Sequence, residues 1–145
     1  MNNIKLWAKA VRAPFFTASV ISVILGGIIA WNITEQFHLL NFVLTTIGVI
    51  LIHAGTNLVN DYFDHKSNLD ETNVNHTPFS GGSRVIQDNE ILPKTMLIVG
   101  LGTFIFAAII GFYLNAVTSG NVILYIGIAG FFIGRICILL PAIAV

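Results

Sequence analysis

The chain has 145 residues, of which 55% are hydrophobic and only 10% are charged. Soluble domains carry about 25% charged residues, so the composition excludes an ordinary soluble domain and indicates a membrane protein. Seven Lys and Arg balance seven Asp and Glu, so no basic surface indicates nucleic-acid binding, and the single cysteine excludes an internal disulfide.

Four apolar stretches are each long enough to span a bilayer, which takes about 20 mostly apolar residues. The first two are joined by a short link, and so are the last two, so each pair is expected to form an antiparallel hairpin. We therefore predict an all-α fold, with residues 1–145 forming one polytopic transmembrane bundle of about four helices. The predicted spans are about 14–33, 39–60, 93–116 and 121–145.

Lys and Arg lie before the first span and between the second and third, and both short links lack them. Positive charge favours the cytoplasmic side. We therefore predict a multi-pass protein of the cell membrane with a cytoplasmic N-terminus and a cytoplasmic loop 61–92. The polar start does not fit a cleavable signal, so we expect the N-terminus to be retained.

The connection 61–92 has about 30 residues, a length that in compact proteins indicates a functional or a disordered segment. It includes turn-forming residues at Ser80–Gly82 and apolar residues such as Val85 and Ile86. The apolar residues favour an ordered loop.

Small residues along the spans allow close helix contact within lipid. Gly130 and Gly134 form a GxxxG pair, for which packing inside the bundle is the first expectation and a dimer face the second. His53 lies in the middle of the second span, where we expect it to be packed or hydrogen-bonded within the bundle rather than catalytic.

The stretch NLVNDYFDHKSNLDE, residues 57–71, holds four of the seven acidic residues. At helical spacing, Asn57, Asn60, Asp61 and Asp64 share one face. Two such carboxylates raise each other's pKa unless a cation lies between them, and Mg²⁺ prefers oxygen ligands. The face therefore predicts a Mg²⁺ site, and the absence of cysteines from this stretch disfavours zinc. A helix that simply ends in polar residues remains the alternative.

The loop continues as TPFSGGSRVIQ, in which Gly81 and Gly82 allow a close backbone approach to a ligand. Ser83 offers a hydroxyl, and Arg84 offers a guanidinium that matches phosphate or carboxylate. Arg12, at the start of the first span, is expected on the same side, either as a positive-inside anchor or as a substrate contact.

These residues resemble a known family. The form N-x-x-N-D-Y-x-D, with another Asp six residues on, resembles the first aspartate-rich motif of the UbiA superfamily of intramembrane aromatic prenyltransferases. It is most similar to the 1,4-dihydroxy-2-naphthoate polyprenyltransferase branch of the menaquinone pathway. PFSGGSRVIQ and KAVRAPFFTASV are similar to the loop and the N-terminal entry of that branch, so the resemblance covers nearly all of the chain.

The resemblance implies a Mg²⁺-dependent transfer of a polyprenyl group from an allylic diphosphate to an aromatic ring, here 1,4-dihydroxy-2-naphthoate, with loss of its carboxylate. It implies metal and diphosphate ligands at Asn57, Asp61 and Asp64, with Asp70 as the final acid of the motif. The residues expected to carry catalysis are Asp61, Asp64 and Asp70, and those expected to bind substrate are Asn57, Asn60, Ser83, Arg84 and Arg12.

The chain departs from the family because it contains no second aspartate-rich motif. We therefore expect a truncated or frame-shifted product of a longer gene, which a separate C-terminal half or a second copy would complete. Half of a cation transporter and a non-catalytic membrane fragment remain alternatives. Transporter sites lie near the bilayer midplane, whereas these acids cluster at the mouth, which favours the enzyme.

Overall fold

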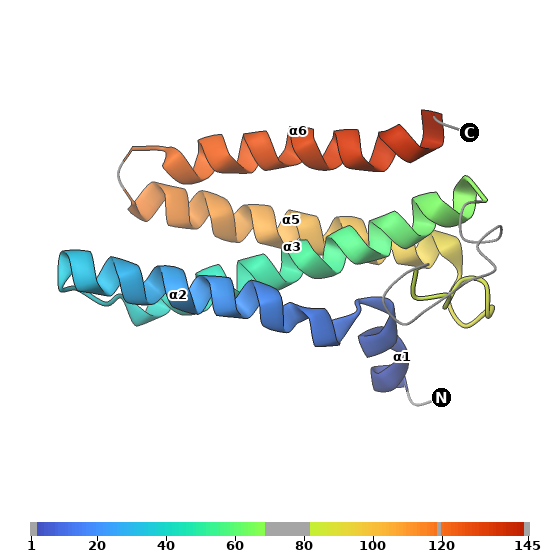
Figure 1. Cartoon of the computed structure of the whole chain (residues 1–145), viewed down its shortest axis with the longest axis horizontal. Coiled ribbons are helices and arrows are strands. Elements are labelled where there is room, and N and C mark those ends of the chain that lie inside the picture. The colour runs from blue at the N-terminus through green and yellow to red at the C-terminus, as the bar shows by residue number, and fades with distance from the viewer. Residues whose placement is uncertain (1–2, 69–81, 119, 144–145) are drawn as a thin grey trace.

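The computed structural model describes residues 3–68, 82–118 and 120–143, with side chains up to residue 134. Every regular element in these ranges is helical, which confirms the all-α prediction. Figure 1 shows the helices lying along one long axis, with one short helix turned away from it. In chain order they are α1 (Asn3–Ala10), η1 (Ala13–Phe15), α2 (Phe16–Thr34), α3 (Leu39–Lys66), α5 (Pro93–Val117) and α6 (Val122–Ile143).

Three helical segments are long and apolar enough to cross a membrane: Ala13–Thr34, Leu39–Lys66 and Pro93–Val117. The predicted fourth span corresponds to α6, which has 22 residues. The part of α6 whose side chains are described, Val122–Gly134, is shorter than a full span.

The second span is longer than predicted, because α3 continues six residues beyond position 60 to Lys66. Nothing in its last two turns interrupts a helix. The helix ends where Asn68 adopts a positive φ of 57° and its N–H reaches the carbonyl of His65 at 3.1 Å. Asp61 and Asp64 therefore lie on the helix, as a shared face with Asn57 and Asn60 requires.

α3 and α5 pack closely along their length, with α2 against α3 and α6 against α5 (Figure 1). A Cβ on Gly55 would lie 2.5 Å from the Thr103 hydroxyl and 3.1 Å from the carbonyl of Gly100. These two glycines thus allow the backbones of α3 and α5 to approach each other. Gly130 and Gly134 do not take this expected role, since no described atom lies within 4 Å of a Cβ at either.

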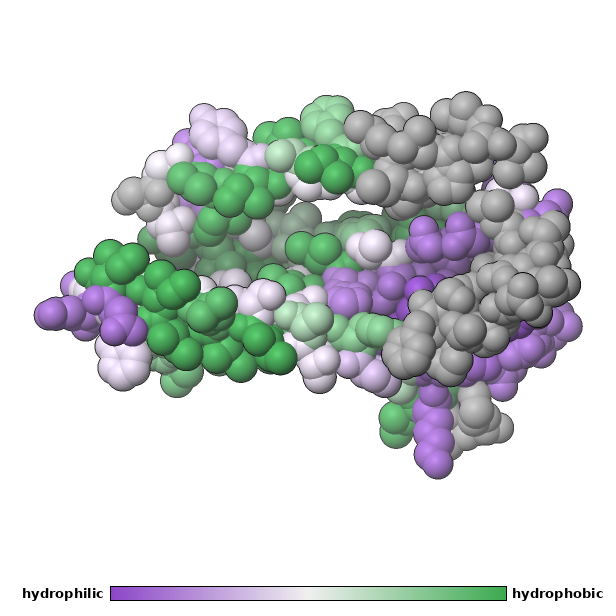
Figure 2. All heavy atoms as spheres, in the orientation of Figure 1, coloured by the Kyte–Doolittle hydropathy of each residue, from purple (hydrophilic) through white to green (hydrophobic). Residues whose placement is uncertain are grey.

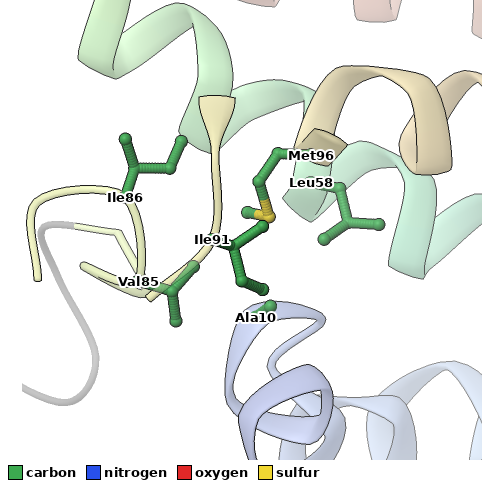
Figure 3. Packing of buried hydrophobic residues seen from close by; sticks show 6 residues of the cluster. All are labelled: Ala10, Leu58, Val85, Ile86, Ile91 and Met96. Carbon is green, nitrogen blue, oxygen red and sulfur yellow. The ribbon is translucent and has the colours of Figure 1, made fainter. Parts of the chain in front are cut away.

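A small helix, α1, precedes the first span, although the sequence analysis predicts no helix there. Leu6 and Trp7 lie four and three residues before Ala10, so all three lie on one side of the helix, where Ala10 belongs to a buried cluster and the other two pack against it. The cluster draws on α1, α3, α5 and the loop before α5 (Figure 3). Its buried members are Ala10, Leu58, Val85, Ile86, Ile91 and Met96.

The surface divides into two regions. Figure 2 shows hydrophobic residues along α2 and hydrophilic residues gathered near α1, at the end of the molecule where α3 ends and α5 begins. We call this end, formed by residues 3–12, 57–68 and 82–96, the polar end, and we call the remaining helical length the shaft. No residue of α2 is buried, so the shaft has the apolar surface expected of helices in lipid.

Candidate functional site

The polar end is organised around the carboxylate of Asp61, which is only 2% exposed. Its Oδ1 accepts a hydrogen bond from Nη2 of Arg12 at 2.6 Å, which is also an ion pair. Its Oδ2 accepts hydrogen bonds from the backbone N–H of Ser83, at 3.1 Å, and from the Ser83 hydroxyl. One carboxylate therefore joins three segments that are far apart in the sequence.

Arg12 is positioned by a sharp turn between α1 and η1. Its backbone is left-handed, with φ 54° and ψ 48°, a conformation uncommon for residues other than glycine. The turn is held from α3, because Nδ2 of Asn57 donates to the carbonyl of Val11 at 2.8 Å. Arg12 was expected to be either an anchor or a substrate contact, and the structure pairs it with Asp61.

Ser83 is positioned by the loop that leads into α5. Val85 and Ile86 are buried in the apolar cluster, and the N–H of Glu90 donates to the carbonyl of Val85 at 2.9 Å. The loop is therefore ordered from Gly82 onward, as its apolar residues predict. Residues 69–81, which include the predicted site residue Asp70, lie outside the described residues.

A second, more exposed contact ties the same loop to α1. Nζ of Lys9 lies 3.1 Å from a carboxylate oxygen of Asp88 and 3.4 Å from one of Glu90. Burial of Lys9 favours its neutral form and is the largest single influence on its pKa. The hydrogen bonds and attraction of Asp88 and Glu90 together outweigh burial and raise the pKa of Lys9 above its usual 10.5.

The other predicted acid on α3 has a different environment. Asp64 is partly exposed, and its Oδ2 accepts a hydrogen bond from Nδ2 of Asn60 at 2.7 Å. The two acids of the predicted common face therefore have different partners. Asp64 accepts a hydrogen bond from Asn60 on the same helix, whereas Asp61 contacts Arg12 and Ser83 from other segments. Arg84 has a left-handed backbone with φ 60°, and its side chain makes no hydrogen bond or ion pair to the described residues.

The described residues fit a metal ion only in part. Amide and carboxylate oxygens of Asn60 and Asp64 are ligands that Mg²⁺ accepts. Both oxygens of Asp61, in contrast, are already engaged by Arg12 and Ser83. No three His, Cys, Asp or Glu side chains converge within the described ranges. The metal assignment of Asn57, Asp61 and Asp64 therefore stays a prediction.

An open recess of about 270 Å³ lies between the start of the first span and α3. Nε of Arg12 is buried and has no hydrogen-bond partner among the described atoms, so its donor capacity is unsatisfied there. The residues lining the recess are Arg12, Phe15, Ala18, His53 and Asn57.

His53 gives the recess a polar group one helical turn from Asn57. Its Nδ1 lies 2.7 Å from the Ser19 hydroxyl, and its ring packs edge-on against Phe16. This confirms the expected hydrogen bond within the bundle. The sequence pattern does not assign His53 to a site, although its spacing of four residues from Asn57 places both on one face.

Comparison with known proteins decides the family. The sequence profile described as "UbiA prenyltransferase family" matches residues 19–136, which is most of the chain. The chain belongs to the UbiA prenyltransferase family. The profile match begins after Arg12 and includes the aspartate-rich stretch of α3 and the Ser83 loop.

Relatives of this UbiA-family chain include 1,4-dihydroxy-2-naphthoate octaprenyltransferase of Bacillus subtilis, which is 33% identical over 129 residues. The UbiA prenyltransferase domain-containing protein 1 homolog of Drosophila melanogaster is 32% identical over 120 residues. The 2-carboxy-1,4-naphthoquinone phytyltransferase of Synechocystis sp. is 35% identical over 66 residues.

These alignments cover 89%, 81% and 46% of this chain in that order. They cover only 39%, 31% and 22% of the three relatives, so the chain spans a minor part of their length. No solved structure matches the chain significantly.

Proposed function

We propose that the chain takes part in transferring a polyprenyl group from an allylic diphosphate to an aromatic acceptor. The proposed acceptor is 1,4-dihydroxy-2-naphthoate, in menaquinone biosynthesis, and the proposed cofactor is Mg²⁺. Family membership supports the reaction class, and the printed activity of the Bacillus subtilis relative supports the acceptor.

The observation that carries the proposal is the junction of Arg12, Asp61 and Ser83 beside long apolar helices. An allylic diphosphate has an anionic head that needs fixed donors and cations, and an apolar tail that prefers hydrocarbon. The polar end offers the cationic side chain of Arg12 in the lining of a recess, and the shaft offers apolar surface. The two parts of the molecule therefore suit the two parts of the donor.

In the proposed reaction, the bond between the allylic carbon and the diphosphate oxygen breaks, and its electron pair leaves with the diphosphate. The electron-rich ring forms a new carbon–carbon bond, and its carboxylate leaves as carbon dioxide. Bound Mg²⁺ would neutralise the charge that develops on the leaving diphosphate. Fixed donors such as Arg12 stabilise the same charge more strongly in a site that excludes water.

The remaining roles follow from the resemblance and stay predictions. The resemblance assigns the binding of metal and diphosphate to Asn57, Asp61 and Asp64, and the completion of the motif to Asp70. The proposed substrate contacts also include Asn60, Ser83, Arg84 and Arg12. The distribution of Lys and Arg supports a plasma-membrane protein whose N-terminus and polar end face the cytoplasm.

A transfer assay tests the proposal. The chain in lipid nanodiscs is mixed with Mg²⁺, a labelled allylic diphosphate and 1,4-dihydroxy-2-naphthoate, and donor binding and prenylated product are measured. We expect Mg²⁺-dependent donor binding and product, both lost in Asp64→Asn. The matched control Asp88→Asn removes a carboxylate that pairs with Lys9 instead and retains both.

Failure of the wild type to bind the donor with Mg²⁺ would contradict the proposal. Passage of Mg²⁺ across liposomes without any product would instead support the cation transporter.

A further inference from the structure

We propose that Asp61 is a positioning residue, which holds Arg12 and the Ser83 loop in place, rather than a direct metal ligand. The inference deepens the proposed function and rests on it only where it concerns an anionic substrate. The sequence pattern treats Asp61 and Asp64 as equivalent metal ligands, and the proposal gives Asp61 a different role from Asp64.

The first argument is that the oxygens of Asp61 are occupied. Three donors converge on them: Nη2 of Arg12, the backbone N–H of Ser83 and the Ser83 hydroxyl. A carboxylate has about four lone-pair sites in all. At most one site therefore remains open, on Oδ1 beside the guanidinium of Arg12.

The second argument concerns charge and water. The guanidinium of Arg12 already neutralises Asp61 at 2.6 Å, so a second cation at the same carboxylate would be repelled by Arg12. Mg²⁺ also keeps several of its waters when it binds protein. Asp61 is 2% exposed and leaves no room for them, whereas Asp64 is partly exposed.

Asp61 holds two groups that border the site, the guanidinium of Arg12 and the loop at Ser83. Arg12 sits in a left-handed turn and lines the recess, with Nε buried and unpartnered among the described atoms. The ion pair with Asp61 fixes the guanidinium of this recess-lining side chain through Nη2. Because the other oxygen of Asp61 holds Ser83, the loop and Arg12 are set by the same carboxylate.

The direct test is a double-mutant cycle of Arg12→Gln and Asp61→Asn, read by thermal unfolding in nanodiscs with EDTA. A positioning role predicts that Asp61→Asn lowers the melting temperature by several degrees without any metal. It also predicts that the double variant is no less stable than Arg12→Gln alone. If Asp61 were a metal ligand, the reverse result would be expected. In EDTA, Asp61→Asn would then relieve the repulsion between Asp61 and Asp64 and leave the melting temperature unchanged or raised. Additive effects of the two substitutions would also overturn the proposal.

A binding measurement separates positioning from simple structural support. In EDTA, the aromatic carboxylate 1-hydroxy-2-naphthoate is titrated against each variant by its fluorescence. Asp61→Asn removes a negative charge, so charge alone predicts tighter anion binding. Loss of the positioned Arg12 predicts the opposite, a weakening of about tenfold that matches Arg12→Gln.

Asp88→Asn serves as the matched control, because it removes a carboxylate that pairs with Lys9 instead, and its affinity in EDTA stays within about twofold of wild type. Unchanged or tighter binding by Asp61→Asn would overturn the proposal. Failure of the proposed function would appear as a wild type that binds no donor with Mg²⁺, and the unfolding cycle in EDTA does not depend on that result.

Discussion

The polar end and the shaft are each stabilised by different interactions. At the polar end, one buried carboxylate and one apolar cluster join α1, α3, the Ser83 loop and α5 (Figure 3). Along the shaft, α2 has no buried residue, and the described part of α6 is exposed apart from a few half-buried positions. The polar end is thus fixed by contacts within this chain, whereas the shaft depends on an apolar environment.

The difference follows from the two solvents. Hydrocarbon is as apolar as the helix side chains, so burying them against one another releases little free energy. The polar end contacts water, where burial of Leu58, Val85 and Met96 is strongly favourable. Helix contact in the shaft relies on close packing instead, at Gly55 and Gly100.

The largest expected effect is that of Arg12→Gln, which leaves the buried Asp61 without its cation. Removing one partner of a buried ion pair costs about 3–5 kcal/mol. We expect the low end of that range, because Arg12 is partly exposed, and unfolding in nanodiscs measures it. Lys5→Gln removes the same charge from an exposed position on α1, so equal effects of the two substitutions would contradict a special role for the polar end.

The apolar cluster and the shaft are compared by removing one large side chain from each. Met96 is 0% exposed and Ile105 is 62% exposed, and both lie on α5. We expect Met96→Ala to lower the free energy of unfolding by about 2–3 kcal/mol, since buried Met→Ala changes typically cost 2–5 kcal/mol. Ile105→Ala should change it by less than about 0.5 kcal/mol. Similar losses would show that the shaft is packed as tightly as the polar end.

Close packing within the shaft is tested at two glycines of α5. A Cβ at Gly100 would lie 2.8 Å from a Val59 methyl, whereas a Cβ at Gly102 has no described atom within 4 Å. Overpacking costs about 1–3 kcal/mol, and Ala gains up to about 1 kcal/mol in helix propensity. We therefore expect Gly100→Ala to destabilise by about 1 kcal/mol and Gly102→Ala to stabilise slightly. A stabilised Gly100→Ala protein would exclude the close contact of α3 and α5.

The smallest expected effect is that of Lys9→Gln, because exposed ion pairs contribute about 0–1 kcal/mol. The folded-state pKa of Lys9 is raised, so its contribution is fully present below about pH 10.5 and is lost as pH rises through the folded value. The difference in melting temperature between wild type and Lys9→Gln should shrink above pH 10.5 and in 1 M salt. A difference that stays constant under both conditions would contradict an ion-pair contribution.

Hydropathy alone predicts the four long helices α2, α3, α5 and α6, because span length is set by the bilayer and polar connections separate the apolar runs. The same pattern identifies the Asn57–Asp64 face and the ordered part of the Ser83 loop. It places the end of α3 six residues too early, because polar residues that leave the membrane can still continue a helix.

The partners of Asp61 could not be predicted from periodicity. Arg12 and Ser83 are 49 and 22 positions away from it in the sequence, and helical spacing relates only residues three or four apart. Asp61 and Asp64 therefore appear equivalent in the sequence, although one is buried with a cation and the other is partly exposed. The turn at Arg12 and the small helix α1 depend in the same way on tertiary contacts.

The most direct test of the account is to locate the diphosphate. An allylic diphosphate analogue with a photoreactive diazirine beside the diphosphate is bound with Mg²⁺ in nanodiscs and activated, and the labelled peptides are identified by mass spectrometry. The account predicts labels at the polar end and in the lining of the recess, within residues 3–18, 53–68 or 82–96, that excess pyrophosphate prevents. Labels confined to the shaft, in residues 98–117 or 122–134, or at the opposite end around residues 31–41, would contradict it.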